Sequence, residues 1–451
     1  MSKKENVTVI GGGLVGCLLS LYLAKKGYQV DVFERKPDLR LAYKEYGRSI
    51  NLALSDRGWK ALHGIGIGED IRKVAIPMYG RMIHDRKGGL AYQPYGRKKQ
   101  AIYSVSRGGL NIALLDLVEA EPNVNLHFNQ TCQGVNLENN EVYLRHADTG
   151  QDTTIASGRL FGVDGAYSLV RYSMQKTERF DYSQSYLNYG YKELTIAPGP
   201  FGRWVLEKEA LHIWPRGTFM MIALPNLNGS FTCTLFFPYQ GEESFEALKT
   251  EAEVLAFFEK HFPDAVPLMP DLVEEYFRNP VGALVTIKCF PWAHQDKILL
   301  LGDAAHGIVP FYGQGMNAGF EDCTVFNELL EQHPGDWQTI FSTFQHKRKP
   351  HTDAMADLAI YNFLEMRDKV ADPRFLLQKK IEGKIHTLYP DQWIPLYTMV
   401  TFSDIPYAEA KAAGEHQEAV MEQIMPHIQT EADFDTPQVQ ALIRQQVLRN
   451  M

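Results

Sequence analysis

The spacing of apolar residues near the N-terminus changes from strand-like to helical and back. Residues 7–10 form a short apolar, β-branched run, and residues 14–26 place apolar side chains at helical spacing. Gly27 follows, where glycine commonly ends a helix, and residues 29–33 again have the composition of a strand. The chain is therefore predicted to begin with a β-α-β unit.

Further along, the pattern first favours strands and then helices. Residues 180–285 are rich in β-branched and aromatic positions, as in Thr218–Pro225 and Ser230–Pro238, which are separated by the turn-forming sequence Asn-Leu-Asn-Gly. A strongly apolar strand is predicted at Ile298–Leu301. From about residue 316 the pattern is helical to the C-terminus, apart from a proline-bearing stretch near 390–406.

These patterns predict a mixed α/β (α+β) fold. A Rossmann-like nucleotide-binding domain is interleaved with a mixed β-sheet domain, and a C-terminal helical segment follows. We assign residues 1–70, 98–180 and 286–360 to the first domain and residues 71–97 and 181–285 to the second. Residues 361–451 form the helical segment, which we expect to close the site between the domains.

Composition excludes some classes of function. Of 451 residues, 45% are hydrophobic, and 46 Lys and Arg face 54 Asp and Glu, for a net charge of −8. No long run of like charge is present, so a nucleic-acid partner is not expected. No window approaches 18 consecutive apolar residues, and the N-terminus lacks the apolar stretch of a secretory signal. We therefore expect no membrane span and a cytoplasmic protein.

The cysteines do not indicate a disulfide framework or a metal site. There are five, an odd number, and they are widely scattered without a C-x-x-C pair. Buried free thiols in a reducing compartment fit this pattern, and no metal is expected. Oligomeric state does not follow from the sequence, which is compatible with a monomer or a dimer.

The first candidate site is the turn Gly11-x-Gly13-x-x-Gly16, with Leu14 and Val15 inside it. It lies between the first strand and the first helix, where such glycines let a pyrophosphate approach the backbone. Glu34 ends the second strand, where a carboxylate can bind a ribose diol, and Arg35 follows it. A lone motif of this kind can be an ordinary turn. The strand, helix and terminal acid in register favour dinucleotide binding, and the acid favours FAD or NAD over NADP.

Three further segments point to the flavin. They are Gly162-Val-Asp164-Gly165, Gly302-Asp303-Ala-Ala-His306 and Ser-Val-Ser-Arg107-Gly-Gly-Leu. Each alone is typical of an ordinary turn. Together and in this order they resemble the single-component flavoprotein monooxygenases, the family of para-hydroxybenzoate hydroxylase. The resemblance implies that the Asp164 motif touches flavin and nicotinamide cofactor, and that Asp303 and Arg107 bind FAD. It also implies no separate NADPH domain, and no second G-x-G-x-x-G follows a strand.

Longer segments resemble the kynurenine 3-monooxygenases within this family. They are Gly47–Gly58, Pro310–Cys323, Tyr361–Arg367 and Leu396–Ser403, with Tyr312 at a position that varies among members. The resemblance implies NADPH- and O2-dependent hydroxylation of L-kynurenine to 3-hydroxykynurenine through a flavin C4a-hydroperoxide, a step of tryptophan catabolism. Eukaryotic members carry a C-terminal membrane anchor. This chain ends in a polar helical segment and is similar to the bacterial members that lack the anchor.

The resemblance also implies a substrate site. Arg81 would bind the substrate carboxylate, with Tyr95 and Tyr397 as hydroxyl partners. Asn362, which can share a helix face with Glu365 and Met366, would bind the amino acid end. An apolar slot for the aromatic ring would be formed by Leu211, Ile222, Leu224, Phe236 and Phe311. By composition alone, Arg81 would be a solvated surface residue and the apolar set would be core.

The catalytic residues are expected in the loop at Pro310, Phe311 and Gln314. Gln314 could reach the substrate ketone. Gly315, Met316 and Asn317 begin the next helix, whose N-terminus would face the flavin pyrimidine edge and stabilise negative charge there. No His–Asp or paired-carboxylate arrangement for deprotonating a substrate is evident, which fits an aniline. His306 is a candidate base, but a structural hydrogen bond explains it better.

Other functions remain open at this stage. A phenol or salicylate hydroxylase of the same fold would need a different carboxylate clamp and a proton relay. Flavin-dependent halogenases share the N-terminal unit, but their Trp-x-Trp-x-Ile-Pro signature is missing. A redox sensor that binds FAD without catalysis is the alternative from another class.

Overall fold

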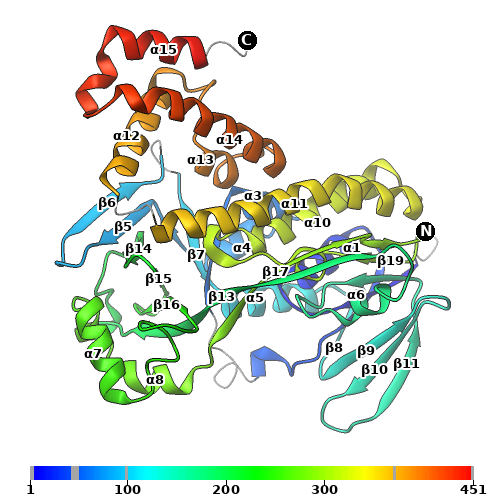
Figure 1. Ribbon diagram of the computed structural model, residues 1–451. Helices are drawn as coiled ribbons and strands as arrows, with labels where there is room; N and C mark the ends of the chain where they lie inside the picture. Colours follow the sequence, from blue (N-terminus) through cyan, green and yellow to red (C-terminus); the bar gives the residue numbers. More distant parts are fainter. Residues whose placement is uncertain (1–4, 42–49, 97–99, 369–371, 448–451) are drawn as a thin grey trace.

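The computed structural model describes residues 5–41, 50–96, 100–368 and 372–447, without the side chains of residues 366–368. Within these residues the strands form two large and two small sheets, and a group of helices follows at the C-terminal end (Figure 1). The mixed α/β fold predicted from the sequence is confirmed. The exact domain boundaries stay a prediction.

The first large sheet carries the β-α-β unit. β1 lies between β12 and β2, and these three strands run parallel. Its order is β18 (Ala293–His294), β19 (Ile298–Leu300), β12 (Arg159–Gly162), β1 (Asn6–Ile10), β2 (Gln29–Phe33) and β8 (Val124–His127). The strands β1, β12 and β19 are almost entirely buried because helices cover the sheet, as is usual for parallel sheets. These helices are α1 (Leu14–Lys25), α5 (Arg107–Glu119) and α10 (Gly315–Gln332).

The second large sheet is mixed and has two differently used faces. Its order is β17 (Gly282–Phe290), β13 (Asp181–Ile196), β16 (Phe231–Pro238), β15 (Met220–Pro225), β14 (Ala210–Pro215), β5 (Gly80–His84) and β6 (Leu90–Pro94). One face packs on α7 (Glu251–His261) and α8 (Leu272–Arg278). Alternate residues of a strand point to opposite faces. On β14, Trp214 therefore packs in this core, while Leu211 and Ile213 line a cavity on the other face.

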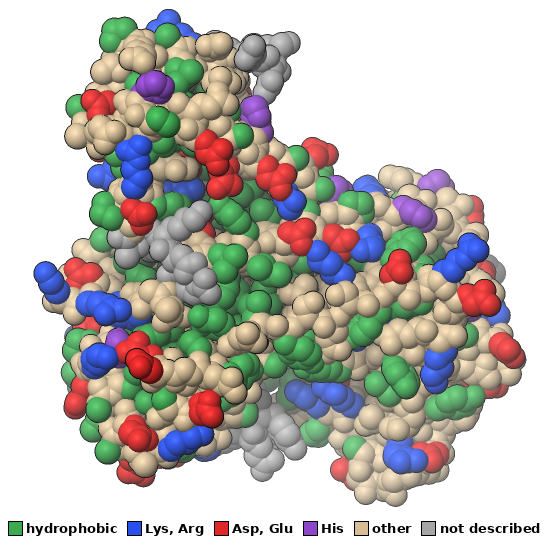
Figure 2. All heavy atoms as spheres, in the orientation of Figure 1, with side chains coloured by type: hydrophobic (Ala, Val, Ile, Leu, Met, Phe, Trp, Pro, Cys, Tyr) green, Lys and Arg blue, Asp and Glu red, His purple; other side chains and the backbone are tan. Residues whose placement is uncertain are grey.

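Small elements connect the two large sheets. One small sheet has the order β3 (Asn51–Leu54), β7 (Ile102–Ser106), β4 (Ala75–Met78), and the other the order β11 (Asp152–Ala156), β10 (Glu141–His146), β9 (Gln130–Asn136). Short helices complete this part: α3 (Asp56–Gly64), α4 (Gly68–Arg72), α6 (Leu169–Met174), α9 (Asp303–His306) and the 3-10 turn η3 (Pro310–Tyr312). On the face drawn in Figure 2, Lys and Arg side chains are interspersed with Asp and Glu.

The C-terminal part is helical. α11 (Trp337–Asp368) crosses the molecule above the second sheet and contacts η3 (Figure 1). α12 (Pro373–Leu388), α14 (Tyr407–Ile424) and α15 (Pro437–Val447) build an apolar core of their own. α13 (Leu396–Thr401) lies inside the stretch that the prolines led us to expect as non-helical, and this expectation was wrong. Pro395 immediately precedes α13, where proline is compatible with a helix start. No helix in the described ranges is long and apolar enough to cross a bilayer.

A buried network of charges joins these parts. Asp322 on α10 accepts hydrogen bonds from Gly302 N (2.9 Å) and from Arg348 Nε on α11 (2.7 Å). Arg348 also pairs with Glu321 (2.6 Å), and Glu321 pairs with Arg57 of α3 (2.5 Å). Arg57 in turn donates to Val400 O in α13 (3.1 Å). The turn after β19, the helices α10 and α11 and the C-terminal segment are therefore held together by one set of ion pairs.

Removing one charge from this network should destabilise the whole fold. Arg348→Met leaves two buried carboxylates with too few partners, so the free energy of unfolding should fall by about 3–5 kcal/mol. Lys347→Met is the control, because the 3.7 Å pair of Lys347 with Glu328 is exposed and should change stability by about 0.5 kcal/mol or less. Urea unfolding measures both. Equal losses would contradict a special role for the buried network.

Candidate active site

The glycine turn after β1 leaves room for a phosphate. Gly11 has a φ of +112°, and a Cβ there would lie 2.5 Å from Val163 O. A Cβ on Gly16 would lie 1.9 Å from Gly11 O, so both positions require glycine for the fold itself. Gly13 differs, because nothing lies within 4 Å of the position of its Cβ. The open space at the N-terminus of α1 fits the pyrophosphate of a dinucleotide.

Glu34 lies beside this turn at the end of β2. Its Oε2 accepts a hydrogen bond from Gly12 N (2.8 Å) and its Oε1 from Lys36 N (3.0 Å). The carboxylate is thus fixed next to the glycines and only half-buried, with lone pairs left for a ribose diol. Arg35 is exposed beside it. The geometry of these residues fits the predicted FAD.

A cavity of about 360 Å³ extends from the glycine turn to the second sheet. Gly13, Leu14, Val15, Arg107, Asp303, Gly315 and Met316 line the part near the first sheet. Arg81, Leu211, Ile222, Leu224, Phe236, Pro310, Phe311 and Tyr397 line the part near the second. The structure therefore brings most of the predicted cofactor and substrate residues into one continuous space.

The two predicted aspartates are placed differently. Asp303 begins α9, is exposed and lines the cavity. Asp164 instead accepts hydrogen bonds from Ser168 Oγ (2.5 Å) and Leu169 N (2.7 Å) at the start of α6, and burial raises its pKa. Its side chain does not line the cavity, although Val163 and Gly165 do. The backbone of this turn is the part available to a cofactor.

Arg81 is a cation in the cavity wall without an anion. Its guanidinium lies 4.5 Å from the ring centre of Tyr397 and 5.5 Å from that of Tyr95. Among the described residues it forms no ion pair, and neither Arg81 Nε nor the buried hydroxyl of Tyr95 has a hydrogen-bond partner. Burial raises the pKa of Tyr95 well above its ordinary value, so the phenol stays protonated and can donate. Of these residues Arg81 and Tyr397 line the cavity, so the guanidinium is the group that can pair there with a carboxylate.

Apolar and aromatic side chains form the rest of this end. Phe311 lies 4.8 Å from Phe236 and stacks on Phe363 at 4.2 Å between ring centres. Tyr95 contacts Tyr397 at 5.4 Å, and both pack with Leu224, Leu211 and Ile222. The residues predicted to form the apolar slot thus line the cavity, and their role as a slot for an aromatic ring stays a prediction.

The loop after η3 forms part of the cavity wall. Gly313 has a left-handed φ of +67°, and Asn317 ties the loop to β3 through hydrogen bonds to Gly313 O (2.8 Å) and Ala53 O (2.9 Å). Gln314 is buried and accepts a hydrogen bond from the hydroxyl of Tyr407 (3.0 Å). Its side chain is not part of the cavity lining, so in this structure it does not face the position of a substrate ketone.

The predicted residues of α11 lie behind the loop. Asn362 Nδ2 donates to Phe311 O (2.7 Å), which fixes the loop that carries Phe311. Glu365 is half-buried and, like Asn362, does not line the cavity. The side chain of Met366 lies outside the described residues. His306 Nε2 donates a hydrogen bond to Asp322 Oδ2 (2.6 Å), and His306 is buried and does not line the cavity, which fits a structural hydrogen bond.

Some cavity residues were not predicted. Ile213, Met220 and Thr234 line the cavity two positions from Leu211, Ile222 and Phe236 on the same strands. Strict application of strand alternation would have found them. Tyr312, also in the lining, stacks on Tyr397 at 5.6 Å, and burial raises its pKa well above the ordinary value. Asn51 lines the cavity from β3 and belongs to the Gly47–Gly58 segment, but it was not predicted as a site residue.

The contrast between two glycines gives a test of the phosphate turn. Gly13→Ala should fold normally but retain much less FAD, because the new methyl group occupies space that the pyrophosphate needs. Gly16→Ala should lower both FAD content and thermal stability, because its Cβ collides with Gly11 O. Flavin absorbance per chain and the melting temperature of the apoprotein measure the two effects. Full FAD content in Gly13→Ala would contradict this placement.

Comparison with known proteins agrees with the geometry. Residues 4–359 match the family described as FAD binding domain. Kynurenine 3-monooxygenase of Flavobacterium johnsoniae is 49% identical over 442 residues, 98% of each chain. Kynurenine 3-monooxygenase of Sus scrofa is 47% identical over 421 residues, 93% of this chain and 88% of that protein.

Solved structures share the fold at low sequence identity. The tetrameric form of 2-methyl-3-hydroxypyridine-5-carboxylic acid oxygenase has a TM-score of 0.64 and 18% identity over 83% of this chain and 96% of that chain. PqsL of P. aeruginosa in complex with 2-aminobenzoylacetate also has a TM-score of 0.64 and 18% identity, over 81% and 97%. Together with the full-length identities, this fold and this cavity mean that the chain belongs to the kynurenine 3-monooxygenase family of FAD-binding monooxygenases.

Proposed function

We propose that this protein uses FAD, NADPH and O2 to hydroxylate L-kynurenine to 3-hydroxykynurenine. The observation that carries the substrate assignment is the guanidinium of Arg81, held in the cavity wall without an anionic partner among the described residues. Relatives named kynurenine 3-monooxygenase, 46–49% identical over almost the whole chain, support the same conclusion. All five cysteines are free and buried, which fits the reducing conditions of the cytoplasm.

The carboxylate of the substrate would bind at Arg81. A buried charge without a partner costs several kcal/mol, and a bound carboxylate removes that cost by pairing. The guanidinium can form two parallel hydrogen bonds to a carboxylate, and the rings of Tyr95 and Tyr397 lie next to it. This arrangement selects a carboxylate over a neutral group.

The aromatic ring would then lie between Arg81 and the cofactor. Leu211, Ile222, Leu224, Phe236 and Phe311 offer an apolar surface there, and burial of an aromatic ring contributes a large share of binding energy. When bound, FAD supplies the hydride acceptor and the oxygen-activating group. The chain's own task is to position the ring and exclude water from it.

Negative charge on the flavin ring would be stabilised by the N-terminus of a helix and not by a charged side chain. Gly315 and Met316 present the N-terminus of the 18-residue helix α10 to the cavity. Unpaired backbone N–H groups at a helix N-terminus favour negative charge. In the described chain no histidine lines the cavity, and the one lining carboxylate is Asp303. An aminophenyl ring needs no base, because its amino group already donates electrons to the ring.

The function is tested by NADPH consumption. We expect L-kynurenine to accelerate NADPH oxidation by the FAD-loaded protein, with a product heavier by one oxygen atom in mass spectrometry. Salicylate and phenol serve as controls, because neither combines an amino acid carboxylate with an aniline. Turnover of salicylate but not L-kynurenine would replace the proposed substrate. A yellow protein that no aromatic acid stimulates would favour a redox sensor.

Arg81→Ala tests the carboxylate clamp. Loss of a desolvated charge pair typically costs about 2–5 kcal/mol, so the KM for L-kynurenine should rise about thirtyfold or more while FAD content stays normal. Arg86→Ala is the matched control, because Arg86 follows β5 but is exposed and should leave the KM within twofold. Steady-state kinetics and flavin absorbance measure these effects. An unchanged KM would remove Arg81 from the clamp.

A further inference from the structure

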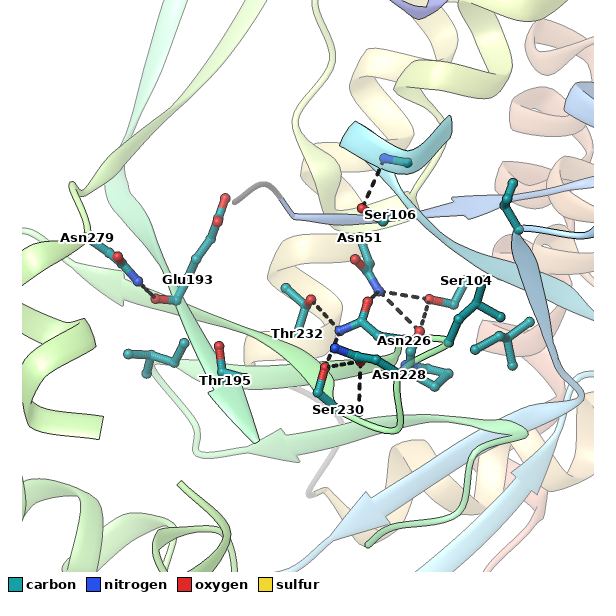
Figure 3. A pocket seen from close by; sticks show the side chains of 16 residues that line it. Asn51, Ser104, Ser106, Glu193, Thr195, Asn226, Asn228, Ser230, Thr232 and Asn279 are labelled. Atoms are coloured by element: carbon teal, nitrogen blue, oxygen red, sulfur yellow. Dashed lines mark hydrogen bonds between the residues drawn. The ribbon is translucent and has the colours of Figure 1, made fainter. Parts of the chain in front are cut away.

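A second cavity, of about 430 Å³, lies beside the flavin cavity. Its walls come from the start of α5 and the strands β3 and β7 on one side, and from β13 and the β15–β16 turn on the other (Figure 3). It is thus located between the small sheet β3–β7–β4 and the second large sheet. None of the functions assigned above uses it.

The two cavities are neighbours on one sheet face. On β16, Thr232 lines the second cavity, and Thr234 and Phe236, the next residues on that face, line the first. On β13, Thr195 and Glu193 line the second cavity and Tyr191 the first. Asn51 lines both. A molecule in the second cavity would therefore adjoin the flavin cavity across Asn51.

The second cavity has rigid polar walls. Asn51 Nδ2 donates to Asn226 Oδ1 (2.8 Å) and Ser104 Oγ (3.1 Å), and Asn226 Nδ2 donates to Ser230 Oγ and Thr232 Oγ1 (3.0 Å each), as Figure 3 shows. These bonds leave Asn51 Oδ1 without a donor among the described residues. Asn228 Oδ1 accepts from Ser230 N and Oγ, and the Asn228 amide N–H groups have no acceptor among the described residues. The walls therefore offer fixed donors and acceptors to a ligand.

The charge of the lining limits the ligand. Among the described residues, the lining consists mainly of amides, hydroxyls and apolar side chains. It contains one carboxylate, Glu193, and no lysine or arginine. A phosphate inside would lack a cation and would be repelled by Glu193. An uncharged group with several hydrogen-bonding atoms fits better.

We propose that this cavity binds the nicotinamide–ribose end of NADPH, an inference that rests on the proposed function. The carboxamide and the ribose hydroxyls are uncharged and both donate and accept hydrogen bonds, as the walls do. The phosphates then lie outside the cavity mouth. The chain has a single G-x-G-x-x-G turn between a strand and a helix, which serves FAD. The reductant therefore binds elsewhere, and this cavity places its ring next to the flavin.

Gly109 allows the cavity to be filled without strain. It lies inside α5 and lines the cavity, and a Cβ there would meet only Ser106, at ordinary contact distances of 3.5 and 3.7 Å. Gly109→Leu in the FAD-loaded protein should raise the dissociation constant of NADP+ tenfold or more in isothermal titration calorimetry. Gly109→Ala should have a small effect. Gly383→Leu, the same change in α12 at a position open to solvent, should have none.

A second variant adds charge without changing the fold. Asn228→Asp keeps the oxygen that accepts from Ser230 but adds a second carboxylate to the cavity lining, which raises the negative charge that the dinucleotide phosphates meet. NADP+ should bind several-fold more weakly at low salt, with a smaller difference at high salt. If Gly109→Leu loses flavin, the calorimetric NADP+ affinity of Asn228→Asp tests the cavity assignment in its place.

The outcomes separate this proposal from the proposed function. NADP+ affinity unchanged in Gly109→Leu and Asn228→Asp, with kynurenine hydroxylation intact, would overturn the cavity assignment alone. Weaker L-kynurenine binding with normal NADP+ binding in these variants would also overturn it. Weakened NADP+ binding in a protein that does not hydroxylate kynurenine would support the cavity assignment and contradict the substrate.

Discussion

The buried ion pairs of Asp322, Glu321, Arg348 and Arg57 are the constraint on which the site depends. No single element forms the flavin cavity. Its walls come from more than one sheet, the η3 loop and α13, which are far apart in the sequence. The network contains two carboxylates and two guanidiniums, so its net charge is zero. Each ion would be costly to bury alone, and together they tolerate burial only in one arrangement. That arrangement fixes where the loop, the helix N-terminus and the C-terminal segment meet.

Arg81 differs from this network because its charge has no ion-pair partner among the described residues. It is half-buried against Tyr397 and Tyr95 but lacks a carboxylate among the described residues. Contact with an aromatic ring offsets part of the desolvation of a guanidinium, by about 0.5–2 kcal/mol depending on how desolvated the site is. The remainder is available to a ligand. Compensated charges thus hold the walls in place, and the uncompensated one provides the driving force for binding an acid.

The sequence predicted the fold well wherever a local pattern coincides with a structural requirement. β2 was predicted with the bounds that it has, and the glycines of the first turn are needed because Cβ atoms at Gly11 and Gly16 would collide with backbone. Residues of the cavity wall followed from the family resemblance, since nothing local distinguishes Arg81 from a surface arginine. The orientation of Gln314 could not be predicted. It depends on Tyr407, 93 positions away, whose hydroxyl holds the amide oxygen.

The second cavity shows why pairing between distant strands limits prediction. Glu193 and Thr234 are cross-strand partners, as are Thr195 and Thr232, so the polar and apolar halves of this face are set by register and not by either strand alone. α13 was missed for a related reason. Its six residues between prolines are too short to be stable in isolation, and it forms because Arg57 binds its carbonyl groups. A side chain of the N-terminal domain thereby completes the C-terminal wall of the site, where Tyr397 contacts Arg81.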